Sequence, residues 1–505
     1  METTFNDRMN PKASSLIRHR GAMEKKFWRS LLLIGIAMHI LAAFLMPLGL
    51  DAHVHASYVS DGMDDGEAHL EWGELRPDSP DSSTPKEVPA DQKWFAWHSI
   101  IEIWFTVFSA STTSLHILSL IGGLGCLATI FLVTRNLFDS EQALRLTALA
   151  SIYPPLIRAT GRFYQEGIIL ILITLAVYSI IRAIRDSKFS YWWVIPVLCC
   201  ILVLSFKGMP LWYILPAISV LLVSSRLEMN QIHIAFIALF VQLVILYRNE
   251  VSLSHPDIVP ALLSSFIGYF LFVICGMLII SKNDSPSNFE SDLLFRGSKM
   301  VAACLIGWVA ALWVTEAVAL EKSFFDIVYS FRNNPRYFSL LLIPLWFSRL
   351  LKKDSVGLSS ENGENKIVVG LVFTLLVINI LVLSTTGTTG SEYVGSHLGD
   401  EITDDEDLLF ISDSPLAMHR LYSIKFSMDP ESDGESIGYW RSNDSGWQVE
   451  LLECNQLSNV TWIFVFHDLT LSISSEWKEV DFEGSDKVSE GYQLYKWGGE
   501  GERCA

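Results

Sequence analysis

The hydropathy pattern divides the chain into two parts at about residue 385. Before that point, long apolar runs alternate with short polar stretches, and a helix needs about 20 mainly apolar residues to cross a bilayer. The runs predicted to span a membrane lie near Ser30–Leu50, 112–134, 142–159, 167–184, 190–206, 209–225, 231–248, 259–281, 299–320, 337–350 and 367–385. We therefore expect a polytopic α-helical membrane protein with about eleven transmembrane helices.

The pattern changes from Asp405 onward, where apolar and polar residues alternate with the period of two that is typical of strands. Strands are predicted at Leu408–Ser412, Trp447–Leu452, Trp462–His467, Glu479–Phe482 and Tyr492–Trp497, with one helix at Pro415–Ile424. Residues 386–505 are thus expected to form a small soluble α/β domain.

The flanks of the first span predict the orientation. Residues 1–29 form a polar leader whose basic residues lie just before the first apolar run, which favours a cytoplasmic N-terminus. Residues 51–111 then form a long outer loop, and its aromatic end at Lys93–Phe108 predicts an interfacial helix. An odd number of spans in the domain at 30–385 places the C-terminal domain outside the cell membrane.

Composition supports this division. Half of the residues are hydrophobic, mean hydropathy is +0.34, and charged residues make up 18%. The net charge is −18, and the 24 acidic and 7 basic residues from Thr386 onward account for −17 of it. Such an acidic surface excludes a nucleic acid partner, which needs Lys and Arg to neutralise phosphates. Cys454 and Cys504 are the two cysteines of the C-terminal domain. They would either form a disulfide in an oxidising compartment or stay free.

Asp51, His53 and His55 occupy alternate positions directly after the first predicted span. In an extended segment these three side chains would project to the same side. Such a trio could bind a divalent metal, or Asp51 could act as a general base that the histidines orient. A hydrated acidic loop is the alternative, but the position at the membrane boundary favours a functional role.

Arginine pairs spaced four residues apart recur at the predicted outer turns. They are Arg158 with Arg162 and Arg332 with Arg336. On a helix each pair shares a face, and two guanidinium groups suit a phosphate, although snorkelling to the interface is the alternative. Glu166 stands near the first pair, and Lys207 adds a cation in another outer turn. Together these residues predict a site for an anionic lipid headgroup.

With these features the chain resembles the GT-C glycosyltransferases, membrane enzymes that take sugars from polyprenyl-phosphate or polyprenyl-diphosphate carriers. Protein O-mannosyltransferases and the aminoarabinose transferases of lipid A belong to that superfamily. The resemblance rests on Asp51 after the first helix, the helix at Lys93–Phe108, Glu166 at a later outer turn, and the C-terminal domain. The acidic pair that is frequent in the superfamily is replaced here by Asp51-Ala52-His53-Val54-His55.

The resemblance implies an inverting transfer of sugar from a polyprenyl-phosphate-linked donor to a lipid, glycan or protein acceptor on the outer face. Asp51 would act as the base and Glu166 as the second acidic position. The donor phosphate would bind to Arg158, Arg162, Arg332, Arg336 and Lys207. No cofactor is implied, apart from a divalent metal that His53 and His55 could hold.

Other classes of protein remain open at this point. A transporter predicts ionisable residues near mid-membrane and an internal repeat, and the sequence shows neither. A non-catalytic receptor would leave the Asp51 segment and the arginine pairs without a role. A polymerase or ligase of lipid-linked glycans would use similar outer-face arginines, so the sequence does not separate it from a transferase.

Overall fold

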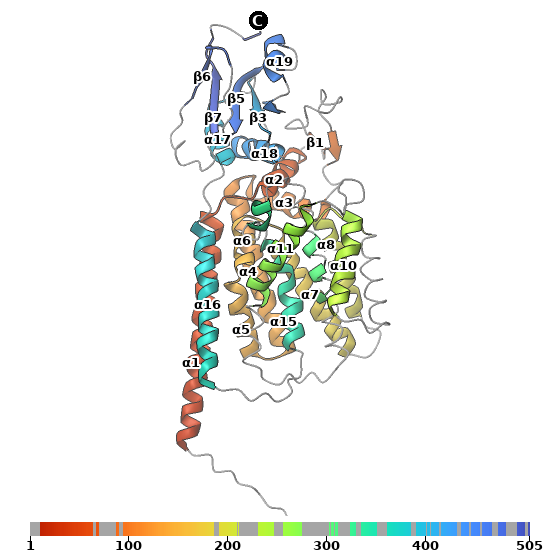
Figure 1. Cartoon of the computed structure of the whole chain (residues 1–505), viewed down its shortest axis with the longest axis vertical. Coiled ribbons are helices and arrows are strands. Elements are labelled where there is room, and N and C mark those ends of the chain that lie inside the picture. The colour runs from red at the N-terminus through yellow and green to blue at the C-terminus, as the bar shows by residue number, and fades with distance from the viewer. Residues whose placement is uncertain are drawn as a thin grey trace, which may run out of the picture.

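The computed structural model describes two connected parts: a helical bundle and, at one end of it, a small domain built on a sheet (Figure 1). The described residues are 11–63, 67–69, 87–89, 94–185, 191–209, 211, 231–246, 256–274, 302–303, 305–307, 309–311, 324–329, 335–350, 361–384, 390–399, 401–403, 406–413, 416–431, 436–443, 446–454, 457–466, 473–480, 492–499 and 503–504.

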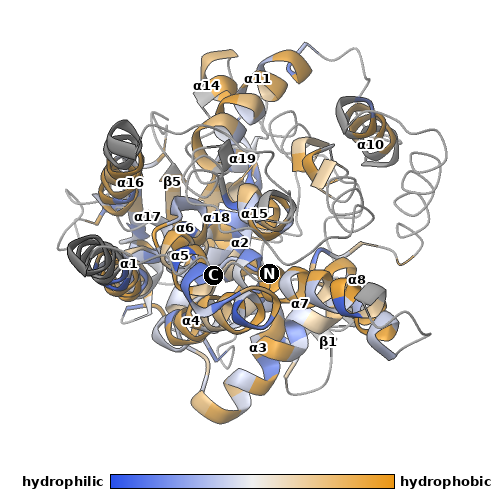
Figure 2. Cartoon of the chain, turned by 90° about the horizontal axis from the view of Figure 1, so that it is seen from below, coloured by the Kyte–Doolittle hydropathy of each residue, from blue (hydrophilic) through white to orange (hydrophobic). Residues whose placement is uncertain are grey.

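The bundle is formed mainly by helices that begin at or near the predicted apolar runs. They are α1 (Pro11–Leu45), α4 (Thr112–Leu137), α5 (Ser140–Ser151), α6 (Pro154–Gly161), α7 (Glu166–Arg185), α8 (Val194–Phe206), α10 (Gln231–Leu246), α11 (Ile258–Gly268), α14 (Phe324–Tyr329), α15 (Leu342–Leu350) and α16 (Glu361–Ser384). Short helical turns at η1 (Tyr191–Trp193), η3 (Tyr269–Ile274) and η5 (Pro335–Leu341) adjoin α8, α11 and α15. Helices α1 and α16 lie side by side along one edge (Figures 1 and 2).

Three of the described helical segments are long and apolar enough to cross a membrane: Lys25–Leu45, Thr112–Leu137 and Glu166–Ala183. Shorter apolar helices occur at Phe95–Phe108, Tyr191–Phe206, Ile258–Phe272, Arg336–Phe347 and Val368–Ser384. Large apolar side chains such as Leu33, Ile121 and Phe373 are exposed on the outside of the bundle, as expected where lipid replaces water. The count of eleven spans is not confirmed, because 212–225 and most of 299–320 lie outside the described residues.

The predicted span at 142–159 is wrong as a single helix, since it consists of α5 and α6. Proline has no amide hydrogen and clashes with a preceding helical turn, so α5 ends at Ser151 and α6 begins at Pro154. Asn379 of α16 donates a hydrogen bond of 2.7 Å to the carbonyl of Ile152 in the break. A side chain of a neighbouring helix thus satisfies a backbone carbonyl that the break leaves without a helical partner.

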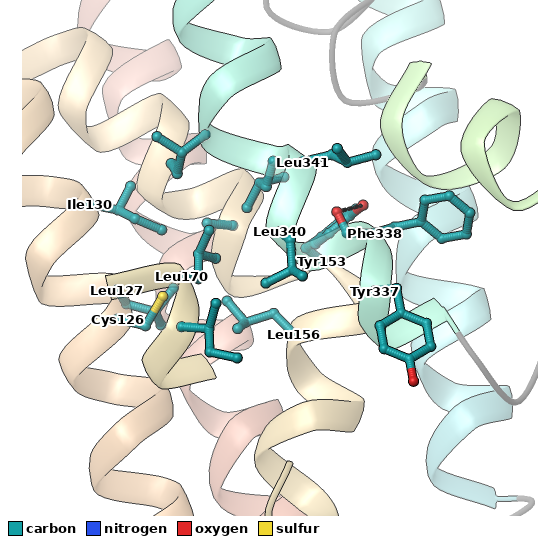
Figure 3. Packing of buried hydrophobic residues seen from close by; sticks show 14 of the residues in the cluster. Cys126, Leu127, Ile130, Tyr153, Leu156, Leu170, Tyr337, Phe338, Leu340 and Leu341 are labelled. Atoms are coloured by element: carbon teal, nitrogen blue, oxygen red, sulfur yellow. Dashed lines mark hydrogen bonds between the residues drawn. The ribbon is translucent and has the colours of Figure 1, made fainter. Parts of the chain in front are cut away.

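A large apolar core joins many of the described helices of the bundle. Its side chains from α4, α6, α7 and η5 point toward one another (Figure 3). The residues labelled there are Cys126, Leu127, Ile130, Tyr153, Leu156, Leu170, Tyr337, Phe338, Leu340 and Leu341. Because η5 belongs to this core, Arg336, which precedes Tyr337, is held in a fixed position.

Two helices lie where the bundle meets the small domain: α2 (Leu50–Asp61) and α3 (Phe95–Phe108). The helix predicted at Lys93–Phe108 is confirmed. In Figure 2, α1 and α16 are seen nearly end-on whereas α3 runs across the view. Helix α3 buries Trp97, Ile101 and Phe105 and exposes Ile103 and Val107, which is the pattern of a helix lying on a membrane surface. The short strands β1 (Glu67–His69) and β2 (Glu87–Pro89) pair in the same outer loop.

The C-terminal domain is built around a five-stranded sheet in the order β4-β3-β5-β7-β6. The strands are β3 (Asp407–Ile411), β4 (Gly438–Arg441), β5 (Val460–Phe466), β6 (Trp477–Glu479) and β7 (Tyr492–Trp497). Strand β3 is parallel to β4 and β5, and β7 is antiparallel to β5 and β6. The predicted α/β class of this domain is confirmed.

Both faces of the sheet are covered, because successive side chains of a strand point in opposite directions. Leu408 and Phe410 pack with α17 (Gly390–Leu398) and α18 (Ala417–Met428). Leu409 and Ile411 pack with α19 (Trp447–Glu453) on the other face. The helix predicted at Pro415–Ile424 corresponds to α18.

The strand predicted at Trp447–Leu452 is wrong, because this segment is helix α19. Gly446, at φ 79°, turns the chain into the helix, and Trp447 and Leu451 then lie four apart on the buried face. Strand β4 and helix α17 were not predicted. Of the strand expected at Glu479–Phe482, only Glu479 is in β6, and residues 481–482 lie outside the described residues. Cys454, at the end of α19, forms a disulfide with Cys504, so the bonded alternative is confirmed.

Candidate active site

The segment after the first helix is itself helical rather than extended, which corrects the geometry expected for its acidic and histidine residues. The carbonyl of Gly49 accepts hydrogen bonds from the amides of Ala52 and His53 at the start of α2. Residues four apart share a helix face, whereas residues two apart do not. Asp51 and His55 therefore line one cavity, whereas His53 is fully buried with its Nδ1 3.1 Å from the Gly49 carbonyl oxygen.

The cavity between the bundle and the C-terminal domain has a volume of about 230 Å³. Its walls combine charged, aromatic and imidazole side chains from segments far apart in the sequence. They are Asp51, Ala52, Val54, His55, Trp94, Phe163, Tyr164, Gln165, Glu166, Lys207, Arg336, Tyr337 and His419. Four of the charged residues singled out in the sequence thus lie in one cavity.

Asp51 and Arg336 form the first ion pair of the cavity. Arg336 Nη1 donates to Asp51 Oδ2 over 2.9 Å. The guanidinium lies 4.3 Å from the ring centre of Tyr164 and 5.0 Å from that of Tyr337, so cation–π contacts hold it in place. Enclosure by protein alone would raise the pKa of Asp51, but the charge and hydrogen bond of Arg336, together with the nearby His419 and His55, outweigh it and lower that pKa to about 2. Asp51 is therefore a carboxylate at neutral pH.

Glu166 and Lys207 form the second ion pair, in which Lys207 Nζ donates to Glu166 Oε1 over 2.6 Å. Glu166 is the first residue of α7, and Lys207 follows the last residue of α8. A carboxylate at a helix N-terminus is favoured by the helix dipole. The ammonium group of Lys207 also lies 5.6 Å from the ring centre of Tyr337, the aromatic residue that contacts Arg336.

His55 closes the cavity on the side of α3. Its Nδ1 lies 3.1 Å from His98 Nε2, and its Nε2 lies 3.5 Å from Gln165 Nε2. Burial, together with the nearby charge of His98, lowers the pKa of His55 to about 3. The ring is therefore neutral at physiological pH and supplies hydrogen-bonding groups rather than positive charge.

Arg158 and Arg162, which were also predicted to bind phosphate, do not line this cavity. Arg158 is buried within α6, and Arg162 follows that helix, where its carbonyl accepts a hydrogen bond from the Gly49 amide. The backbone of Arg162 therefore supports the turn before α2. Arg332 lies outside the described residues.

The residues present do not fit the divalent metal site expected from Asp51, His53 and His55. Asp51 is paired with Arg336, His53 faces away, and His55 contacts His98. Within the described part of the chain, no group of three or more His, Cys, Asp and Glu side chains is arranged to hold a metal ion. We therefore propose no role for a metal ion in the reaction.

Sequence reasoning missed His419, which lines the cavity from α18 of the C-terminal domain. It also missed the aromatic wall of Trp94, Tyr164 and Tyr337, of which Trp94 begins α3 with φ 58°. The hydropathy pattern holds no signal for His419, because the residue belongs to an ordinary amphipathic helix of a soluble domain.

Residues 94–248, just under a third of the chain, match the family model described as dolichyl-phosphate-mannose-protein mannosyltransferase. Over this segment the chain is similar to a GT-C-type membrane glycosyltransferase family. The matched segment contains Glu166 and Lys207, while Asp51 and Arg336 lie outside it.

Two solved structures are similar to this chain at low sequence identity. The Archaeoglobus fulgidus oligosaccharyltransferase, in complex with Zn and sulfate, aligns at 11% identity and a TM-score of 0.43, over 86% of this chain and 68% of its own. ArnT from Cupriavidus metallidurans in the apo state aligns at 9% identity and a TM-score of 0.33, over 93% of this chain and 98% of its own. The sequence has no significant match among curated proteins.

Proposed function

We propose that this chain is a glycosyltransferase, which moves a sugar from a polyprenyl-phosphate-linked donor to an acceptor hydroxyl in the cavity at the end of the bundle. The observation that carries the proposal is the convergence of Asp51, Glu166, Lys207 and Arg336 on that cavity. They come from α2, the start of α7, the end of α8 and η5. Paired charges gathered from four segments at the end of apolar helices are typical of a functional site in a membrane protein.

The donor phosphate is proposed to bind between Arg336 and Lys207. Both cations lie against the ring of Tyr337, at 5.0 and 5.6 Å from its centre. A guanidinium group can hold two phosphate oxygens at once, and an ammonium group adds a point charge. Lys207 ends an apolar helix, so a phosphate beside it lies at the level where a polyprenyl tail would enter the membrane.

The transfer forms a bond between the acceptor oxygen and the anomeric carbon of the sugar. The bond between that carbon and the phosphate oxygen breaks, and its electron pair leaves with the phosphate. Arg336 and Lys207 stabilise the charge that develops there. Asp51 accepts the proton that the acceptor hydroxyl loses, and its side chain is 46% exposed, so it can reach a reactant in the cavity.

Arg336 is proposed to serve both partners in turn. Without donor, it neutralises Asp51 over 2.9 Å and keeps the pKa of that carboxylate low, which makes Asp51 a weak base. A phosphate that draws the guanidinium toward itself would leave the negative charge of Asp51 less neutralised. The pKa of Asp51 would then rise, and the carboxylate would become a stronger base. The base is thus strengthened when the donor is in place.

The C-terminal domain and the cavity are proposed to face the extracytoplasmic side, with the N-terminus in the cytoplasm. The Cys454–Cys504 disulfide supports this placement, because disulfides persist mainly in oxidising compartments. The acidic character of this domain and the basic leader before the first span agree with it.

The test of the proposed function is sugar transfer in membranes that contain the full chain, with radiolabelled polyprenyl-phosphate hexoses as donors. Asp51→Asn should lower the rate at least about 100-fold, since it removes a general base. The matched control is Glu102→Gln, which changes an exposed carboxylate of α3 that does not line the cavity. Transfer that persists in Asp51→Asn at the wild-type protein level would overturn the proposed role.

A further inference from the structure

His419 brings the C-terminal domain into the cavity. Its Nε2 lies 3.9 Å from Asp51 Oδ1, and its side chain is 31% exposed. Among the residues that line the cavity, it is the one that comes from beyond residue 386. Its Nδ1 is buried and has no hydrogen-bond partner among the described residues. The ring is thus directed at the carboxylate and is not held by its own domain through that nitrogen.

The helix that carries His419 is fixed to α2 along its length. Lys425 Nζ donates to Asp61 Oδ1 over 2.8 Å, and both side chains are largely buried. Phe426 is fully buried in the core of the bundle, with its ring centre 6.2 Å from that of Phe105. Ser57 Oγ also donates to the carbonyl of Tyr422. The two helices α2 and α18 therefore form one unit that carries Asp51 and His419 together.

The two oxygens of Asp51 have different partners. Oδ2 accepts the hydrogen bond of Arg336, and Oδ1 faces His419 at 3.9 Å, which is too long for a hydrogen bond but close enough for an electrostatic contact. A charge or dipole beside each oxygen favours one orientation of the carboxylate. If the donor phosphate draws Arg336 away, the imidazole is the partner that remains.

We propose that His419 is a positioning residue for Asp51, and that through it the C-terminal domain is a component of the transfer site rather than a separate binding module. This inference rests on the proposed function, because it assigns His419 to the base of that reaction. It predicts that the transfer rate depends on the docking of α18 even though the donor phosphate binds to residues of the bundle.

The first experiment measures transfer from a polyprenyl-phosphate hexose by full-length His419→Ala and His419→Gln in detergent or membranes. The maximal rate of His419→Ala should fall about 10- to 100-fold, while the KM for donor changes less than about threefold, because the phosphate ligands are intact. His419→Gln, which keeps a polar N–H group beside the carboxylate, should recover part of the rate. A maximal rate in His419→Ala equal to wild type would overturn the proposal.

The matched control is His397→Ala. This histidine belongs to α17 of the same domain, lies 3.6 Å from Glu401, and does not line the cavity. The control should transfer sugar at the wild-type rate. Equal losses in His397→Ala and His419→Ala would show a general effect on the domain and would overturn the specific role of His419.

A second experiment does not depend on sugar transfer. A carbodiimide reacts with protonated carboxyl groups, and mass spectrometry of the peptides measures how fast each one is modified. Arg336, His55 and His419 act on Asp51, and Lys207, Glu166, Tyr164 and Tyr337 share its cavity. His419→Ala should raise the modification rate of Asp51 about threefold or more, with Asp61 and Asp407 as internal references for folding.

The two experiments separate the two proposals. If the wild-type chain transfers none of the hexoses but Asp51 still becomes more reactive in His419→Ala alone, the proposed function fails and the coupling between the residues stands. If transfer occurs but neither the maximal rate nor the reactivity of Asp51 changes in His419→Ala, the proposed function stands and the role of His419 fails.

Discussion

The two ion pairs of the cavity are chemically alike but differ in exposure. Asp51 pairs with Arg336 over 2.9 Å and its side chain remains 46% exposed. Glu166 pairs with Lys207 over 2.6 Å and its side chain is 1% exposed. One carboxylate is thus open to a reactant, while the other is covered by protein.

This difference in exposure indicates different roles for Asp51 and Glu166, which the sequence suggested as two catalytic carboxylates. A covered carboxylate cannot take a proton from an acceptor, but it can hold a cation in position and compensate for the cost of enclosing its charge. We therefore propose that Asp51 accepts the proton and that Glu166 holds Lys207 toward the donor phosphate. Substitutions in either ion pair test this difference.

The largest effect is expected from Arg336→Met, which breaks the open pair. The donor loses a phosphate ligand, so kcat/KM should fall about 100-fold. The pKa of Asp51, now about 2, should rise toward its ordinary value of 3.8, because the guanidinium charge and its hydrogen bond are gone. Since the carboxylate is the active form, activity should be lost on acidification at a higher pH than in wild type. A pH–rate profile from 3 to 8 measures the shift, and an unmoved acid limb would show that Arg336 does not control Asp51.

A smaller effect on transfer is expected from Glu166→Gln, which breaks the covered pair. The KM for donor should rise about tenfold because Lys207 is no longer held, while the acid limb of the profile stays in place. Leaving a covered charge without its partner should also lower the free energy of unfolding by about 3 kcal/mol. The double variant Glu166→Gln with Lys207→Met should recover part of that stability in thermal unfolding. A fall in kcat as large as in Asp51→Asn would instead make Glu166 a second base.

The smallest effect is expected from Gly208→Ala, next to Lys207. Gly208 has φ 60°, and a Cβ atom there would lie 2.5 Å from Nε1 of Trp94, which lines the cavity. The indole would be displaced on the Lys207 side while the Asp51 pair is untouched. The KM for donor should rise about threefold at unchanged kcat, with Gly370→Ala, which has open space around its Cβ, as the control. A lowered kcat would show that the two sides of the cavity are not independent.

Charged residues at apolar helix ends could be found from the sequence because they stand out against a hydrophobic background. Glu166 and Lys207 begin and end apolar helices, and Arg336 precedes one. The same signal also selected Arg158 and Arg162, which do not line the cavity. Spacing of four residues shows that two side chains share a face, but it does not show which neighbour that face meets.

Local backbone conformation decided the cases in which the prediction was wrong. Asp51, His53 and His55 alternate, so an extended segment would align them, but the turn at Gly49 starts a helix and rotates His53 away. The segment Trp447–Leu452 likewise has apolar residues compatible with periods of both two and four. Whether such a short segment forms a strand or a helix depends on the packing around it, and a single sequence does not show that packing.

The docking of α18 on α2 has a consequence for biosynthesis. Asp61 and Lys425 are separated by 364 positions, and Asp51 and His419 by a similar stretch of chain. The described helices of the bundle, up to α16, are therefore translated before α18, which completes the wall of the cavity. The residues proposed to bind the donor phosphate are thus synthesised before His419, the residue proposed to position the base.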